Sequence, residues 1–378
     1  MPRIRKEKAG QQLKIAEREV RFSQWPTKQN GNAHSLQFEV LTSNPWEIIR
    51  YAIIEKQPNV SDQVAPLSFL HQAQEFYRAS QTFQVASKPL LLYYCLMNLA
   101  KSFILHRSVT NDINHAVHGI SEDRLPSTAQ EFLDSTVSVH PNSTNSPQIY
   151  ALFGKALGAR PLLTKTQYSV VKDILPQIVI GHRLWASAAD APERFIRIQR
   201  VRIRHARKIK SVWLTIDVQR SDLKECRLNH TQLRHLTSLD ADFVEVKPRS
   251  SIDSKRYCRL ELKLPIPYNR RPGDALKSLS DKLRPYLWTV VRPIPPYRRH
   301  YLYAPPPNSK VIHPILSIYA AIFYLGSVTR YRPHHFDMIA KTEYGNLVHE
   351  IIDNQILQVL FQLASEFARR EVSSPAVL

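Results

Sequence analysis

The sequence predicts an α+β protein in which N- and C-terminal helical segments lie around a central β-rich region. Two changes in hydrophobic period predict this fold class. Apolar residues recur at helical spacing between residues 45 and 106 and again after residue 314. Between residues 195 and 303 strict alternation replaces this spacing, most clearly over residues 212–218, and alternation indicates strands with one buried face.

Composition and length set the scale of the molecule. The chain has 378 residues, of which 43% are hydrophobic and 22% charged, a balance typical of a globular protein. A chain of this length is expected to form about two or three structural units. We expect a basic N-terminal arm over residues 1–40, a mainly helical unit over 41–158, a β-rich basic unit over 159–308 and a helical unit over 309–378.

The first half of the chain is predicted to be mainly helical. Residues 1–40 are polar and basic with little periodicity, so we expect a mobile arm with a short helix around residues 11–20. The segment from Pro89 to His106 is apolar nearly all round, which is typical of a helix surrounded by other helices. Further helices are expected from residue 45 and over residues 61–80 and 148–157, with a strand over residues 136–140.

Strands are predicted to dominate the middle of the chain, after one more helix over residues 166–178. The expected strands cover residues 195–204, 212–219, 242–247, 258–264, 287–291 and 300–303. Helical spacing then returns. The last expected helices cover residues 314–327, 333–341 and 344–370.

The chain is strongly basic, since 52 Lys and Arg residues against 32 Asp and Glu residues give a formal charge of +20. Such an excess attracts polyanions, namely nucleic acid, an anionic surface or an acidic protein. The densest basic run, residues 194–210, contains no acidic residue and is rich in Arg, whose forked guanidinium suits phosphate. The predicted nucleic-acid-binding residues are Arg194, Arg197, Arg200, Arg202, Arg204, Arg207, Lys208, Lys210, Arg298 and Arg299.

Tyrosines recur beside these cations, as at Arg256-Tyr257 and Tyr297-Arg298, and such pairs suit stacking and phosphate contacts on single strands. No recognition-helix motif for duplex DNA is visible, so RNA or single-stranded nucleic acid is the favoured partner. A solvated basic surface without a dedicated ligand would have the same composition.

Several function classes are excluded by missing motifs. Only nine glycines occur, and neither a P-loop nor a Gly-x-Gly-x-x-Gly fingerprint is present. The three cysteines, Cys95, Cys226 and Cys258, are widely spaced and predict neither a disulfide framework nor a thiolate zinc site. No apolar run approaches the roughly 20 residues of a membrane span, and the basic start is not followed by an apolar export segment. A reducing cytoplasm is therefore expected.

One polar stripe on the apolar helix 89–106 is a candidate catalytic site. Tyr94, Asn98 and Lys101 fall at helical spacing on one side of it. Lys101 would hold a phosphate, Asn98 would orient it, and His118 would act as acid or base, as in a nuclease or another phosphoryl-handling hydrolase. The alternative is structural: Lys101 reaches solvent near the helix end and Asn98 is satisfied internally.

Other nuclease patterns carry less weight. The Arg-x(4–6)-His motif of HEPN-type ribonucleases occurs at Arg200–His205 and Arg330–His335, no more often than chance predicts in so basic a chain. Asp217 with Glu245-Val246-Lys247 imitates the acidic triplet of restriction-type nucleases, but Glu261-Leu262-Lys263 does so too, and any amphipathic strand produces it. No metal site or cofactor is predicted, and a divalent metal is expected only if the protein is a nuclease.

Several blocks of sequence resemble one family, the YaaC-like family of bacterial proteins. The blocks are Asn44-Pro45-Trp46, Gln74-Glu75-Phe76-Tyr77-Arg78-Ala79, Asn98-Leu99-Ala100-Lys101, His118-Gly119 and Arg330-Tyr331-Arg332-Pro333. The resemblance covers about residues 44–370, so the basic arm is an addition to it. It implies a cytoplasmic bacterial protein with an α+β layout and implies no mechanism.

Three hypotheses therefore stay open at the level of the sequence. The favoured function is binding of RNA or single-stranded nucleic acid through the Arg-rich surface. The second is a nuclease or hydrolase centred on Tyr94, Asn98, Lys101 and His118. The third is a non-catalytic interaction protein whose basic face meets an acidic protein partner. The sequence does not indicate an oligomeric state.

Overall fold

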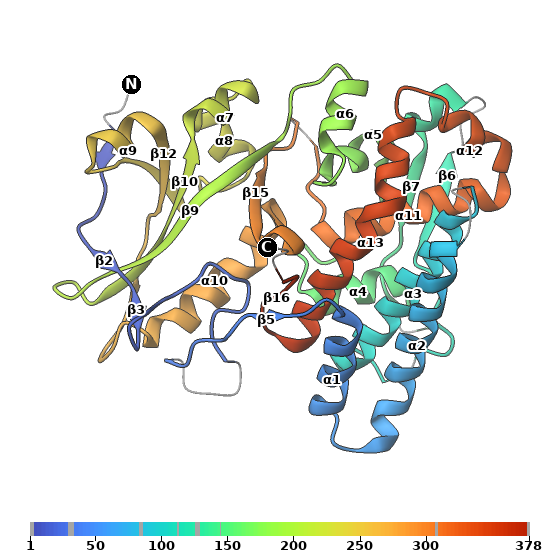
Figure 1. The fold of residues 1–378 in the computed structure, drawn as a ribbon, viewed down its shortest axis with the longest axis horizontal. Helices are drawn as coiled ribbons and strands as arrows, with labels where there is room; N and C mark the ends of the chain where they lie inside the picture. Colours follow the sequence, from blue (N-terminus) through green and yellow to red (C-terminus); the bar gives the residue numbers. More distant parts are fainter. Residues whose placement is uncertain are drawn as a thin grey trace. The chain divides into compact units, whose positions relative to one another are not determined.

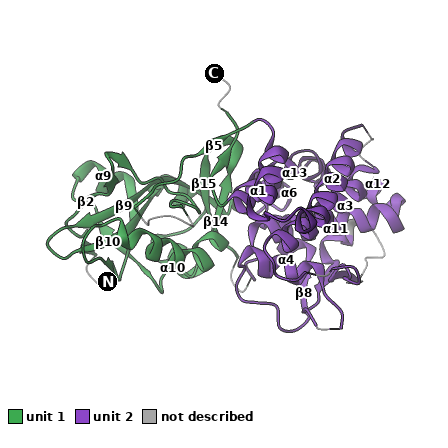
Figure 2. Ribbon diagram, turned by 90° about the horizontal axis from the view of Figure 1, so that it is seen from below, with its two compact units in different colours: residues 1–42, 192–309, 369–378 green, residues 43–191, 310–368 purple. Residues whose placement is uncertain are grey.

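The computed structural model describes residues 4–28, 34–82, 86–111, 113–124, 129–143, 145–306 and 309–375. The fold is α+β, as the sequence predicts. The chain forms two compact units, coloured separately in Figure 2. Unit 1 contains residues 1–42, 192–309 and 369–378, and unit 2 contains residues 43–191 and 310–368.

This division differs from the four consecutive segments expected from the sequence. The N-terminal and C-terminal helices belong to the same unit, because helix α1 (Pro45–Lys56) packs against helix α13 (Gly345–Ala368) and covers its apolar side chains. The N-terminal arm belongs with the β-rich region. Each unit is therefore built from segments that lie far apart in the sequence.

Unit 2 is organised around helix α3 (Lys88–His106), which packs against α2, α4, α11 and α13 (Figure 1). Leu96, Leu99 and Phe103 of α3 are almost fully buried, as expected for an apolar helix surrounded by others. The remaining helices of this unit are α2 (Val60–Thr82), α4 (Ile149–Leu157), α5 (Val171–Ile174), α6 (His182–Ala188), α11 (Pro314–Tyr331) and α12 (Pro333–Ile339). A small sheet has the order β6 (Ile120–Arg124), β7 (Thr136–Val139), β8 (Gln167–Val170).

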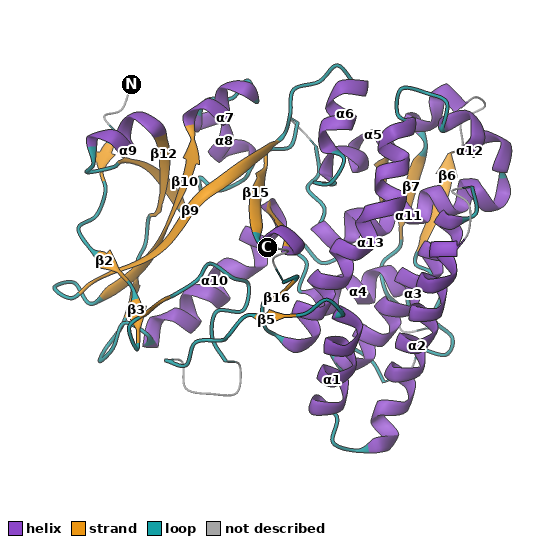
Figure 3. Cartoon of the chain, in the orientation of Figure 1, coloured by secondary structure: helices purple, strands orange, loops and turns teal. Residues whose placement is uncertain are grey.

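Unit 1 contains the main sheet, whose strand order is β1-β11-β12-β10-β9-β15-β14, with β13 added to β10 and β2 added to β9 (Figure 3). Its strands are β1 (Arg5–Lys6), β2 (Gln11–Gln12), β9 (Phe195–Ala206), β10 (Ser211–Gln219), β11 (Phe243–Lys247), β12 (Tyr257–Leu262), β13 (Ile266–Pro267), β14 (Val291–Ile294) and β15 (Arg299–Tyr303). Smaller pairs are β3 (Lys14–Ile15) with β4 (Arg18–Glu19) and β5 (Val40–Leu41) with β16 (Val372–Ser373).

The described part of unit 1 also contains four α-helices. They are α7 (Arg220–Glu225), α8 (His230–Leu236), α9 (Ser251–Arg256) and α10 (Asp274–Val290). Helix α10 packs against β10 and buries Leu276, Leu279 and Leu283. Within the described residues, no helix of either unit combines the length and the apolar character that a membrane crossing requires.

Two predicted elements outside the N-terminal arm are wrong. The helix expected over residues 166–178 is strand β8, followed by the short helix α5 and a 3-10 turn at Leu175–Gln177. Strand β8 pairs with β7, and Pro176 lacks the N–H that a continuing helix would need. The strand expected over residues 287–291 is mostly the end of α10, because the apolar run there continues the helical spacing of the earlier leucines.

The N-terminal arm also differs from its prediction, since the described part is ordered by the main sheet. No helix forms over residues 11–20. Strand β1 pairs in parallel with β11, and β2 pairs antiparallel with β9. Leu13, Val20 and Trp25 are buried, with exposed fractions of 1%, 3% and 4%. Three separated apolar anchors and the pairing of the backbone therefore fix a segment whose overall composition is polar.

We expect Leu13→Ala to lower the free energy of unfolding of unit 1 by about 2–5 kcal/mol, because it removes a fully buried side chain. Ile4→Ala is the matched control, since Ile4 lies in the same arm but is 46% exposed. Chemical denaturation followed by tryptophan fluorescence measures both variants. Equal stability of the two variants would mean that the arm is not part of the folded core.

Candidate functional site

The basic run of residues 194–210 forms strand β9 and the tip of the β9–β10 hairpin. Alternation along β9 places Arg200, Arg202 and Arg204 on one face of the sheet. Asp217 of β10 lies directly opposite Arg200, and Arg259 of β12 lies opposite Asp217, so these side chains share that face. The strand thus turns the middle of the basic run toward acidic partners.

Arg259 is the centre of a buried charge network on this face, which we call the arginine–carboxylate network and define as Glu7, Arg200, Arg204, Asp217, Asp253 and Arg259. Arg259 is only 2% exposed. Its Nε and Nη2 donate to the two carboxylate oxygens of Asp217 at 2.6 and 2.7 Å, a bidentate pair. Arg200 donates to Asp217 at 3.0 Å and forms an ion pair with Asp253 at 2.8 Å.

Glu7 of the N-terminal arm completes this network. Its carboxylate accepts hydrogen bonds from Arg204 at 2.9 Å, from Arg259 and from the backbone N–H of Arg249 at 3.1 Å. Burial alone would raise the pKa of Glu7, but these donors and positive charges lower it below its ordinary value. Burial would likewise lower the pKa of Arg259, but Asp217 and Glu7 raise it. Both groups are therefore held in their charged forms.

Three of the predicted nucleic-acid-binding residues lie beside carboxylates of this network. Arg200 and Arg204 already bind carboxylates, and Arg202 lies 3.9 Å from Asp217. The sequence analysis missed their partners Glu7, Asp253 and Arg259. Only the alternation of β9 could have signalled that these arginines share one face, since the partners come from distant segments.

The restriction-nuclease arrangement of Asp217 and Glu245 is not assembled. Val246 lies opposite Arg259 and therefore on the face of Asp217, so Glu245 points to the other face. There Glu245 binds Arg220 at 3.3 Å and His230 at 3.0 Å. The described residues contain no group of three or more His, Cys, Asp or Glu side chains that could hold a metal ion.

The cations at the tip of the β9–β10 hairpin are placed differently. Arg207, Lys208 and Lys210 are exposed, and so is Ile209 between them, at 58%. The backbone N–H of Tyr268 donates to the carbonyl of Lys210 at 2.9 Å, which brings the exposed residues 270 and 271 close to the hairpin. We define the hairpin surface by its five cations: Arg207, Lys208, Lys210, Arg270 and Arg271. In the part of the chain that the structure describes, none of them forms an ion pair.

The other predicted binding residues do not join this surface in one patch. Arg197 is exposed on β9, opposite Tyr301. Arg298 pairs with Glu39 at 3.1 Å, and Arg299 is exposed at the start of β15. Arg194 precedes β9, and its carbonyl accepts a hydrogen bond from the N–H of Ala304 at 2.9 Å.

In unit 2, the predicted catalytic residue His118 contacts Tyr93, a residue that the sequence did not single out. The ring of His118 stacks on Tyr93 with centroids 5.7 Å apart, and Nδ1 of His118 is hydrogen-bonded to the Tyr93 hydroxyl. Partial burial, together with the positive charges of Lys101 and Arg330, lowers the pKa of His118. We call His118, Lys101, Arg330 and Tyr93 the histidine cluster. At neutral pH its imidazole is uncharged and able to accept a proton.

Lys101 itself lies over the ring of Phe69 at 5.2 Å, and burial lowers its pKa. Asn98 is turned away from this role, because it is 2% exposed and donates to the carbonyl of Tyr94 in its own helix at 3.0 Å. Internal satisfaction of Asn98 was the structural alternative in the sequence analysis. The charge of Arg330, a residue that was not predicted for this site, contributes to the lowered pKa of His118.

We expect the Glu7→Gln variant to be about 3–5 kcal/mol less stable than the wild type at pH 7, because it leaves Arg259 and Arg204 short of a buried carboxylate. Since the folded pKa of Glu7 is lowered, its contribution is present above pH 4.5 and disappears as the pH falls below that value. The stability difference between the two proteins should therefore shrink under acid conditions. Denaturation at pH 7 and pH 4 measures it, with exposed Glu19→Gln as the control. A constant difference at both values would contradict the pairing.

We expect Lys101→Met to raise the pKa of His118, because it removes one of the positive charges that disfavour the imidazolium. Arg330→Gln should have an effect in the same direction. NMR titration of the His118 ring protons gives the pKa directly. Lys165→Met removes an exposed charge elsewhere in unit 2 and should leave the His118 titration unchanged. An equal shift of the His118 pKa in all three variants would mean that the overall charge of the protein, and not the charges of Lys101 and Arg330 in particular, acts on His118.

Comparison with known proteins identifies one family whose model matches this chain. The model of the YaaC-like protein family matches residues 31–367, which is most of the chain. Searches of curated proteins and of solved structures found no match. Residues 4–28, which supply Glu7 and pair with the main sheet, precede the matched region. The resemblance seen in the sequence is confirmed: this chain belongs to the YaaC-like protein family.

Proposed function

We propose that the protein binds RNA or single-stranded nucleic acid through the hairpin surface. The observation that carries this proposal is the group of five exposed cations on that surface, which form no ion pair with any described residue. A chain of formal charge +20 attracts nucleic acid as a whole, and exposed cations that form no side-chain ion pair are the ones most able to replace counterions on phosphates. Of the five, Arg271 also has a carboxylate near it, since its backbone N–H donates to Asp274 at 2.9 Å.

The location of this surface differs from the one predicted. The middle of the basic run, Arg200 to Arg204, faces Asp217 and Glu7, so exchanging these carboxylates for phosphates would break buried pairs. Contacts at the hairpin tip carry no such penalty. Binding is therefore assigned to the tip, and the arginines of β9 hold the sheet together.

The chemistry of the surface also limits its specificity. Tyr268, the tyrosine tied to the tip, is 8% exposed, and the exposed apolar residue at the tip is the aliphatic Ile209. Neither presents an open ring on which a base could stack. Phosphate contacts position a nucleic acid without reading its sequence. We thus expect affinity with a strong salt dependence and little sequence preference.

The test is fluorescence anisotropy with a labelled single-stranded RNA and DNA over a range of salt concentrations. Replacing Arg207, Lys208 and Lys210 together by Ala should weaken binding at least tenfold. It should also reduce the slope of log affinity against log salt by about 2, since each single-strand phosphate contact contributes roughly 0.7. The control replaces the exposed Lys224, Lys247 and Lys255 by Ala and removes the same charge from unit 1.

Two outcomes would contradict the proposal. Equal losses of affinity in the hairpin variant and the control variant would mean that net charge alone governs binding. No binding by the wild type at low salt would exclude nucleic acid and favour the remaining hypothesis, an acidic protein partner.

A second candidate function, phosphoryl hydrolysis, is favoured by one observation: His118 is hydrogen-bonded to Tyr93, and its pKa is lowered by burial and by the charges of Lys101 and Arg330. A neutral imidazole supplies a general base, and the two cations would stabilise charge on a phosphoryl group. The binding samples, run on a denaturing gel, test this directly. We expect shortened RNA with the wild type and intact RNA with His118→Ala, whereas Lys165→Ala should cleave normally. Intact RNA with the wild type would rule out cleavage of this substrate.

A further inference from the structure

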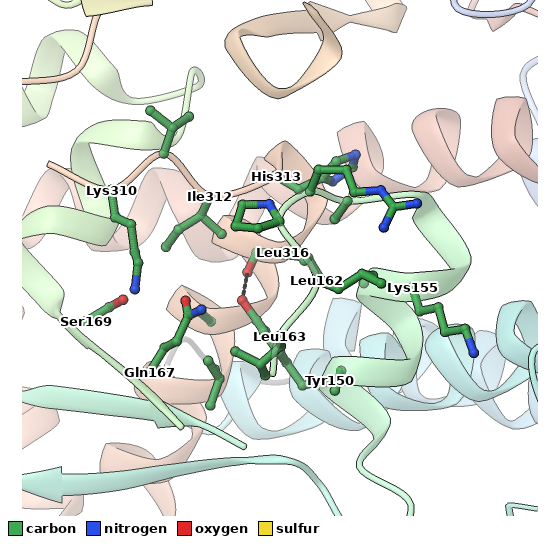
Figure 4. Close-up of a pocket in the computed structure, with 18 of the residues that line it drawn as sticks. Tyr150, Lys155, Leu162, Leu163, Gln167, Ser169, Lys310, Ile312, His313 and Leu316 are labelled. Carbon is green, nitrogen blue, oxygen red and sulfur yellow. Dashed lines mark hydrogen bonds between the residues drawn. The ribbon is translucent and has the colours of Figure 1, made fainter. Parts of the chain in front are cut away.

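Unit 2 contains a cavity of about 140 Å³ that neither proposed function uses (Figure 4). It lies between strands β7 and β8, helix α4, residues 159–163 and the start of α11.

The floor of the cavity is apolar. Val137, Ile174 and Ala320 are at most 2% exposed, and Leu316 is 7% exposed. The hydroxyl of Tyr150 donates to the carbonyl of Leu316 at 3.4 Å, so this polar group is already satisfied. A cavity of similar volume with aliphatic walls holds a single benzene ring. The floor therefore suits one ring or a short branched chain.

The mouth of the cavity has the opposite chemistry. Lys155, Arg160 and Lys310 are exposed, and Gln167 and Ser169 are half-buried. Figure 4 shows Lys310 reaching toward Ser169, while Lys155 extends on the other side. Asp and Glu are absent from the lining, every residue of which is described. The mouth thus presents positive charge and hydrogen-bond donors with no local carboxylate.

We propose that this cavity binds a small carboxylate whose apolar part is one ring or a short branched chain. The apolar part enters the floor, and the carboxylate stays at the mouth beside Lys310 and Arg160. The volume of about 140 Å³ limits the buried part of the ligand to about the size of a benzene ring. Charge favours an anion over a neutral hydrocarbon, because the guanidinium and ammonium groups donate charge-assisted hydrogen bonds to a carboxylate. The site is independent of nucleic-acid binding.

The experiment uses ¹⁹F NMR on the full chain with 4-fluorophenylacetate as the probe and the neutral 4-fluorophenylacetamide as its isostere. We expect saturable binding of the acid, at least tenfold tighter than that of the amide. The double variant Arg160→Ala/Lys310→Ala should weaken binding of the acid at least tenfold and leave the amide unchanged. The control Lys172→Ala/Lys341→Ala removes two exposed charges of unit 2 outside the cavity and should bind both probes normally.

A second variant tests the floor. Ala320→Leu fills the cavity and should abolish binding of both probes. If this variant does not fold, the Arg160→Ala/Lys310→Ala variant, which changes only exposed residues, still tests the site. Equal affinities for the acid and the amide would overturn the assignment of a carboxylate. Binding of the acid that survives both the double variant and Ala320→Leu would place it elsewhere and overturn the site, as would no binding at all.

Discussion

The burial of the Arg259 guanidinium is the constraint on which the architecture of unit 1 depends. A charged group that is 2% exposed is stable only when carboxylates surround it, since an unpaired buried ion costs several kcal/mol. Asp217 supplies one carboxylate from the neighbouring strand β10, and Glu7 supplies another from the N-terminal arm. The pairing therefore fixes β10, β12 and the arm in one arrangement. A different register of any of these strands would leave charges buried without partners.

The same pairing separates the cations of unit 1 into two groups, those that are paired with buried carboxylates and those that are exposed. The arginines in the middle of β9 are balanced by acidic residues from distant parts of the chain, so they act mainly on stability. The cations of the hairpin surface are exposed and form no ion pair with any described residue. In unit 2, burial together with the charges of Lys101 and Arg330 lowers the pKa of His118. The net charge of the chain does not distinguish these three environments of its cations.

Much of the fold follows from periodicity in the sequence. The apolar pattern of α3 predicted a surrounded helix, and alternation predicted β9, β10 and β12, because both patterns arise from local geometry. The arm could not be predicted in this way. Leu13, Val20 and Trp25 are too far apart to form a period, and the strands they anchor are two residues long.

The candidate sites, like the arm, combine residues that the sequence can single out with residues that only the fold brings to them. Lys101 and His118 could be singled out from their residue types, and the charge of Lys101 contributes, after burial, to the lowered pKa of His118. Arg330 could not be linked to them, because it is more than two hundred residues further along the chain. The cavity of unit 2 is likewise built from segments around residues 137–174 and 310–320, and only the fold brings these segments together.

We propose that nucleic acid contacts the hairpin surface and does not contact the arginine–carboxylate network. Photo-crosslinking of the full chain to RNA that contains 4-thiouridine, followed by mass spectrometry of the crosslinked peptides, tests this claim most directly. We predict crosslinks to residues 207–210 and 268–271. Crosslinks concentrated at residues 200–204, at the arm around Glu7 or in unit 2 would contradict it.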